Sequence, residues 1–340
     1  MHDKRRSYTM KDTIRRKCEL LAENKELIQK TFFLENGLMN TVAAAAYTEK
    51  EQTVDVDYLK ECHKVLTKKQ SLLSEFRGSR EVMVTAKMAL SGNPEGYIED
   101  VVSVYKKLQS GKFWDSPYKA IAAMVIVDAG KVNEADAIIA KSKEIMEGMK
   151  KDHPFLTSDE DTSFAVLLAM TDKSVEAILT ELEESFQYIK KDFSFHQNAA
   201  YSLSQVLTTY PGDAQSKKDK ALELLKAFEA AGTKYGKDYE LASIGSLVDI
   251  KMNTNELVDE IVEIADYLKE NKGFGSLSMS KASRLMFGNL LVSQVYASDD
   301  NKAEASVVTG TVARVVAEET AMFVAIMAAS SASIINSSSH

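Results

Sequence analysis

A pattern of paired helical segments recurs through the middle of the chain at intervals of roughly 40 residues. Each unit begins with an apolar run long enough for a helix, followed by a short polar turn. An amphipathic segment that ends in lysines comes next, and then a loop with an aromatic residue. The apolar runs are residues 82–90, 120–127, 164–170, 199–207, 241–250 and 285–296. Helix pairs of this kind bury a continuous core only when they stack on one another.

The two helices of a pair differ in how their apolar residues are spaced. In the second helix they recur at i, i+3, i+4 and i+7, as in Val175, Ile178, Leu179 and Leu182. Such spacing places one apolar stripe on a charged cylinder, so we expect this helix to face solvent on one side. The first helix is more uniformly apolar, so we expect it to be buried on several sides.

Glycine and proline are scarce, which favours helices over other fold classes. The 340 residues include only 15 Gly and 4 Pro, about half the usual share of roughly 12%. Sandwiches, barrels and α/β folds draw on these residues for their many turns. We therefore predict one all-α domain of about six or seven stacked α/α helix pairs, curved like a solenoid or partly closed. Whether the stack closes into a ring stays open.

No linker rich in Pro, Gly or Ser divides the chain, so we predict a single domain with three parts. Residues 1–78 form a looser N-terminal helical unit, residues 79–298 the helix-pair repeats, and residues 299–336 closing C-terminal helices. Helix starts are marked by Asn93 before Pro94, and by the capping-box spacings of Asn253 with Glu256 and Ser158 with Asp161.

The loops that lead from a second helix to the next first helix share a composition and should lie at one end of the stack. Each has a lysine followed within a few residues by an aromatic side chain, a combination that can bind anionic or planar ligands. The candidate ligand-binding residues at this end are Lys112, Trp114, His153, Asp159, Asp161 and His196. The alternative is structural, because lysines suit helix C-termini and acids suit helix starts.

Recognisable catalytic motifs are absent from the chain. It has no phosphate loop of the GxxxxGK[ST] kind, no HExxH helix and no GxSxG nucleophile elbow. Cys18 and Cys62 fit neither a disulfide framework nor a metal knuckle. We therefore name no catalytic residue, no metal ligand and no cofactor, and we favour a protein that is not an enzyme.

Charge is unevenly distributed along the chain, whose formal net charge is −8. That balance argues against general nucleic-acid binding, although the first 17 residues are basic. The N-terminus lacks an apolar run of the signal-peptide kind, so we expect a cytoplasmic protein.

The C-terminal segment is apolar and uncharged. Residues 320–335, from Thr320 to Ile335, contain no Asp, Glu, Lys or Arg, but they are shorter than the roughly 20 residues of a membrane span. We expect a buried closing helix that packs on the alanine-rich residues 42–46 or on a second copy, giving a homodimer. A membrane anchor is the alternative.

Residues 153–170, HPFLTSDEDTSFAVLLAM, resemble a bacterial family found mainly in Gram-positive species. It is the domain-of-unknown-function family numbered four thousand and three. The chain length and the Ala/Ser-rich C-terminal end are similar too. The resemblance implies a cytosolic all-helical protein and supplies no activity, substrate or catalytic residue.

Three functions are compatible with these features. The first is a helical-repeat scaffold that binds a protein or peptide on a concave surface. The second is an enzyme or small-molecule binder with a site at the loop end near His153 and His196. The third is a membrane-peripheral protein that uses the basic N-terminus or the C-terminal apolar segment. The sequence favours the scaffold.

Overall fold

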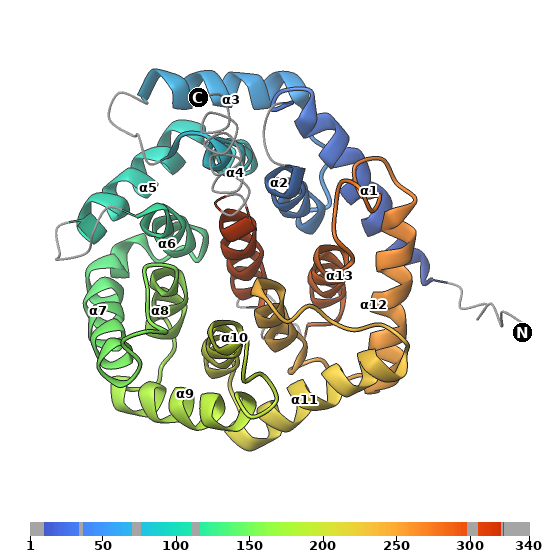
Figure 1. The fold of residues 1–340 in the computed structure, drawn as a ribbon. Coiled ribbons are helices and arrows are strands. Elements are labelled where there is room, and N and C mark those ends of the chain that lie inside the picture. The colour runs from blue at the N-terminus through green and yellow to red at the C-terminus, as the bar shows by residue number, and fades with distance from the viewer. Residues whose placement is uncertain are drawn as a thin grey trace, which may run out of the picture.

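The structure, a computed structural model, is a ring of helices with a further helix along its axis (Figure 1). It describes residues 10–33, 37–69, 76–109, 116–297, 305–320 and 322. Within these residues the regular structure is entirely helical, which confirms the predicted single all-α domain.

Seven helices form the outer wall of the ring in the described part of the chain. They are α1 (Asp12–Gln29), α3 (Val56–Lys69), α5 (Pro94–Gln109), α7 (Ala135–Asp152), α9 (Val175–Ile189), α11 (Ala214–Ala230) and α12 (Thr254–Lys269). A short 3-10 turn, η3 (Val132–Glu134), precedes α7.

The inner wall alternates with the outer wall along the chain. Its elements are α2 (Gly37–Glu49), α4 (Ser79–Leu90), α6 (Pro117–Asp128), α8 (Asp161–Ala169), α10 (Gln197–Thr209), η4 (Tyr239–Leu247) and α13 (Lys281–Tyr296).

Burial follows the spacing of the apolar residues. Every residue of α8 is buried, whereas α9 buries a stripe that includes Ile178, Leu182 and Phe186 and exposes its other side. The expected division into enclosed first helices and solvent-facing second helices is therefore what the ring contains. Two helix starts are also capped as expected: the Asn253 side chain accepts from the Asn255 and Glu256 N–H groups, and Asn93 accepts from the Gly96 N–H. Ser158 does not cap a helix, because α8 begins only at Asp161, which accepts from the Ser158 N–H.

One inner element differs in its helix type from what the apolar run 241–250 suggests. It forms the 3-10 helix η4 in place of an α-helix. Gly245 lies so close to α10 that a Cβ atom there would stand 2.6 Å from Cγ1 of Val206. A 3-10 helix is narrower than an α-helix, and a residue without a side chain allows this close approach.

The ring is closed where the first and last helix pairs meet. Helix α1 packs against α12 and α13, and α13 contacts α2. Nζ of Lys25 in α1 donates to the Gly273 carbonyl at 2.6 Å and lies 4.1 Å from the centre of the Phe274 ring. Burial lowers the pKa of Lys25 to about 8.

The helix of residues 305–320 fills the axis of the ring (Figure 1). Its buried residues include Val308, Val312 and Val316, and Arg80 of α4 forms an ion pair with its Glu318 at 2.6 Å. Most of the predicted closing segment, residues 321 and 323–335, lies outside the described residues. No helix in the described part of the chain is both long and apolar enough to span a bilayer.

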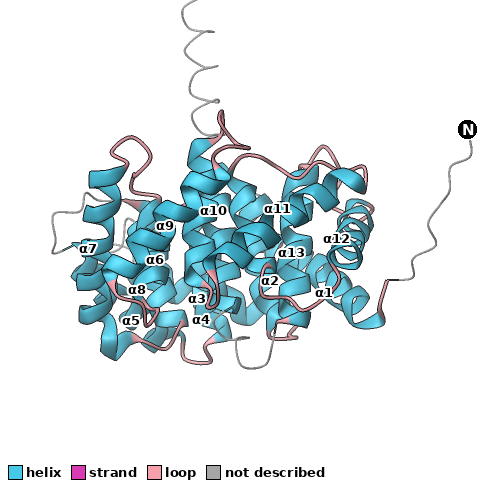
Figure 2. Ribbon diagram, turned by 90° about the horizontal axis from the view of Figure 1, so that it is seen from below, coloured by secondary structure: helices cyan, strands magenta, loops and turns pink. Residues whose placement is uncertain are grey.

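Because outer and inner elements alternate, the connections fall into two sets on the two faces of the disc (Figure 2). Those from an inner element to the next outer helix lie on one face, here called the cavity face. Those from an outer helix to the next inner element lie on the opposite face, here called the loop face. Four of the candidate residues named from the sequence lie at the loop face: His153, Asp159, Asp161 and His196.

Candidate functional site

Among the loop-face residues expected to bind a ligand, His153 follows the end of α7, Asp161 begins α8 and His196 precedes α10. Lys112 and Trp114 lie outside the described residues. His153 hydrogen-bonds Glu183 at 2.5 Å, and its ring packs edge-on against Phe186 and Tyr201. His196 instead hydrogen-bonds Asp238 at 3.1 Å, so the two histidines engage different carboxylates.

The two acids near His153 have different surroundings. Asp159 is exposed, whereas Asp161 is buried at the start of α8 and accepts from the Ser158 N–H at 2.8 Å and from Gln205 at 2.5 Å. Burial raises the pKa of Asp161 to about 7. The described residues contain no group of three His, Cys, Asp or Glu side chains arranged to hold a metal ion.

A cavity of about 1170 Å³ opens at the other end of the inner helices, on the cavity face. It lies inside the ring, between the C-terminal ends of the inner helices and the beginning of the axial helix. Apolar lining residues include Val42, Met83, Leu167, Leu290 and Val308. Its volume slightly exceeds the usual range of roughly 300–1,000 Å³ for small-molecule pockets.

Charged side chains also line this cavity. The cations are Lys17, Lys50, Lys87, Lys131, Lys173 and Arg314, and the anions are Glu49, Glu51, Asp128 and Asp172. The lining is therefore more cationic than anionic, although the whole chain is acidic.

A buried cluster around Asp128, the last residue of α6, joins three parts of the ring to the axial helix. Its Oδ1 accepts from Tyr97 Oη at 3.0 Å, while Oδ2 accepts from Arg314 and lies 3.2 Å from Nζ of Lys87. Burial by itself would raise the pKa of Asp128, but Lys87 and Arg314 hold it below its usual range. Burial and the adjacent Asp128 raise the pKa of Tyr97.

Asp128 is therefore an ionised carboxylate already engaged by three partners. Such a group is poorly suited to accept a further proton as a general base. It can fix the positions of the two cations beside it. Lys87 uses one contact to Asp128 and lines the cavity, so its ammonium can also donate to a bound anion.

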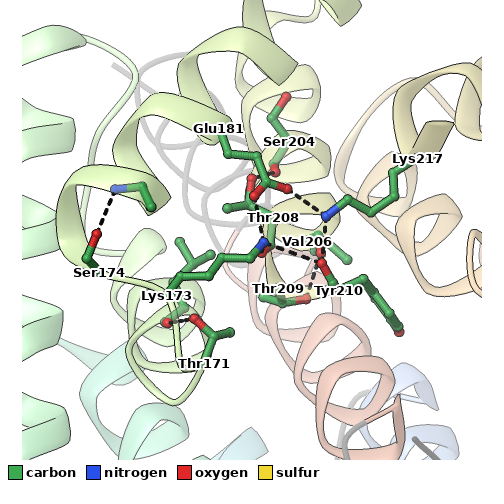
Figure 3. A network of polar contacts seen from close by, with 12 residues as sticks. Thr171, Lys173, Ser174, Glu181, Ser204, Val206, Thr208, Thr209, Tyr210 and Lys217 are labelled. Carbon is green, nitrogen blue, oxygen red and sulfur yellow. Dashed lines mark hydrogen bonds and ion pairs between the residues drawn. The ribbon is translucent and has the colours of Figure 1, made fainter. Parts of the chain in front are cut away.

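Lysines also satisfy the last carbonyls of the inner helices around this end of the ring. Figure 3 shows Glu181 between Lys173 and Lys217, each 2.6 Å from one of its carboxylate oxygens. Lys173 donates to the Thr208 carbonyl at 2.8 Å and Lys217 to the Tyr210 carbonyl at 2.6 Å. These contacts neutralise the negative end of α10.

Gly310 leaves part of the cavity wall open. It lies in the axial helix and lines the cavity, and a Cβ atom built on it meets nothing within 4 Å. Glycine inside a helix costs roughly 1 kcal/mol relative to alanine. No neighbouring atom is close enough to require a glycine at position 310. The missing side chain therefore leaves space free in the cavity beside the axial helix.

Sequence reasoning missed the cavity because its polar residues are far apart in the chain. Lys87, Tyr97, Asp128 and Arg314 come from four helices and belong to no local motif. A single Asp or Lys at the end of an apolar helix looks like a capping residue. One feature of the sequence does point to the cluster: Asp128 is a charged residue at the end of a uniformly apolar run. A charged side chain in such a place cannot stay buried without a partner, so a cation nearby could have been expected.

The fold and cavity define a class of protein: an all-helical closed ring with an axial helix and an internal cavity at one end. The family model described as "Protein of unknown function (DUF4003)" matches residues 24–321. The chain therefore belongs to this family, as the sequence resemblance implied. No curated protein and no solved structure matches the chain.

Proposed function

We propose that the protein binds a small organic anion with an apolar part in the central cavity. The observation that carries this proposal is the cavity itself, which is lined both by apolar side chains and by the Lys87–Asp128–Arg314 cluster. The cations suit a carboxylate, sulfonate or phosphate group, and the apolar walls suit the body of the molecule.

This proposal places the ligand at the opposite end of the inner helices from the site expected near His153 and His196. It also differs from the scaffold expectation. A peptide-binding helical repeat uses an open concave surface, whereas here the ring closes on itself and the axial helix occupies its centre. A protein or peptide partner, a homodimer, a helical-repeat role and a cytoplasmic location remain predictions from the sequence.

Fluorescent probe binding to the full chain tests the proposal. Anilinonaphthalene sulfonate is an apolar body with one anionic group, and N-phenylnaphthylamine is a neutral analogue of similar shape. We expect Gly310→Leu, which fills the cavity from an open position, to weaken the binding of both probes at least tenfold (about 1.4 kcal/mol). Lys87→Met should weaken the sulfonate more than the neutral probe.

A matched control separates this effect from general changes in charge. Lys251→Met removes an exposed lysine on the same face of the disc that does not line the cavity. It should leave the binding of both probes unchanged. If Gly310→Leu folds with an unchanged melting temperature and still binds the sulfonate as the wild type does, the cavity is not the binding site.

A further inference from the structure

Large apolar or aromatic side chains project from the loop face, opposite the cavity. Phe33, Phe155, Phe195, Tyr239 and Leu277 each stand on or beside a different connection between an outer helix and an inner element. Phe155 and Phe195 are 96% and 97% exposed, and Leu277 is fully exposed. Single exposed apolar residues are ordinary, but among the described residues five stand at the loop face against Tyr58 at the cavity face, so the two faces of the disc differ.

Some of the exposed residues have buried or hydrogen-bonded neighbours. Phe32 is buried beside Phe33, and Phe193 is buried two residues before Phe195. Nζ of Lys150 donates to the Pro154 and Thr157 carbonyls, on either side of Phe155. Leu277 lies within a backbone turn in which the Ser278 N–H donates to the Gly275 carbonyl at 2.8 Å. The connections around Phe155 and Leu277 are thus held by hydrogen bonds while these two side chains are exposed.

Charge differs between the two faces of the disc. The difference lies in the last three residues of every helix on each face, taken together with the described connection that follows. On the loop face, twelve Lys and Arg stand against nine Asp and Glu among the described side chains, and two of the nine are the buried Glu318 and Glu319 of the axial helix. On the cavity face, four stand against eight. The loop face is therefore the positive side of an acidic protein.

We propose that the loop face docks on an anionic lipid bilayer. The exposed side chains would insert among the lipid acyl chains near the headgroups, while the lysines of the same connections contact the anionic headgroups. The apolar tips are separate and lie around the rim of a disc, an arrangement that a fluid lipid surface accommodates. A protein partner would instead require one continuous complementary patch.

The end of the axial helix lies on the same face. The Tyr118 hydroxyl, at the start of α6, hydrogen-bonds Sδ of Met322 at 3.5 Å. The sequence from Met322 to Ser339 contains no charged side chain. The experiment must therefore distinguish the loop tips from this segment.

Vesicle flotation of the full chain tests the proposal. Vesicles of phosphatidylcholine mixed with phosphatidylglycerol should carry the protein upward, and vesicles of phosphatidylcholine alone should carry far less. The triple variant Phe155→Ser, Phe195→Ser, Leu277→Ser should reduce the floated fraction on anionic vesicles at least tenfold. Its melting temperature should not change, because all three side chains are exposed.

Two control variants locate the binding surface. Tyr58→Ser removes an exposed aromatic side chain from the N-terminal turn of α3, at the cavity face, and should not alter flotation. Lys191→Glu should weaken flotation, whereas Lys251→Glu, on the cavity face, should not.

Three results would overturn the proposal. One is a wild-type chain that stays unbound on anionic vesicles. Another is flotation that survives the triple loop variant but is lost with Phe323→Ser and Ile326→Ser, which would assign it to the C-terminal segment. The third is a wild-type chain that does not float and sediments as a dimer, together with a triple variant that sediments as a monomer. That result would make the loop face a contact between two copies of the chain. The cavity proposal is independent of all three results.

Discussion

At the residue scale, the cluster at Asp128 concentrates charge where two walls of the ring meet the axial helix. One carboxylate serves two cations and a tyrosine there, and all are largely shielded from water. Removing one partner from such a group leaves charge buried without compensation, which costs about 3–5 kcal/mol. We therefore expect Asp128→Asn to lower the free energy of unfolding by that amount in urea denaturation.

The exposed ion pair between Lys107 and Asp136 provides the matched control. Its two groups lie 2.8 Å apart with the aspartate side chain 81% exposed. Exposed pairs contribute about 0–1 kcal/mol, so Asp136→Asn should change the free energy of unfolding by no more than that. Equal effects of the two variants would show that the Asp128 cluster does not hold the axial helix in place.

A second residue, Asp161, makes stability depend on pH. Its pKa is raised from 3.8 to about 7 by burial, so the folded chain binds this proton more tightly than the unfolded chain. The resulting stabilisation is fully present below pH 4, falls as the pH rises, and is lost above about 7. Asp161→Asn removes this titration, and its amide oxygen can still accept from the Ser158 N–H.

Unfolding free energies of the Asp161→Asn variant and the wild type, measured in urea across the range from pH 5 to 8, check this prediction. As the pH rises, the unfolding free energy of the wild type should fall relative to that of the Asp161→Asn variant. The exposed Asp159→Asn variant should follow the wild type throughout. A constant difference between Asp161→Asn and the wild type across that range would contradict the assignment.

At the element scale, the sequence predicted helices well because burial follows apolar spacing. The stripe of Ile178, Leu182 and Phe186 in α9 is visible in the sequence and buried in the structure. The 3-10 form of η4 was not predictable, because it depends on the approach of Gly245 to Val206 of another helix. The cavity was missed for the same reason, since Asp128 and Arg314 meet only in the closed ring.

The axial helix gives a prediction of its own. Gly310 lies inside the axial helix, and a Cβ atom there meets nothing within 4 Å. Because alanine has a higher helix propensity than glycine, Gly310→Ala should raise the free energy of unfolding by roughly 1 kcal/mol. Thermal and urea unfolding should both show the gain. A loss of stability would mean that the Gly310 position is more crowded than the cavity wall indicates.

At the scale of the whole molecule, closure of the ring changes how the ends of the chain unfold. In an open stack, each terminal unit contacts one neighbour and opens by itself. Here α1 packs on α12 and α13, and Lys25 reaches the carbonyl of Gly273. The first and last helix pairs should therefore protect each other against opening.

Gly273 and Gly232 together test this coupling. Both have positive φ angles, +80° and +74°, so alanine at either position carries backbone strain of about 1–2 kcal/mol. A Cβ atom at Gly273 would also lie 3.3 Å from Nζ of Lys25, whereas Gly232 has open space. Gly273→Ala should raise amide hydrogen exchange in α1 as well as in α12 and α13, and Gly232→Ala only near α11 and η4. If Gly273→Ala leaves exchange in α1 unchanged, the ends of the chain open independently and closure adds no cooperativity.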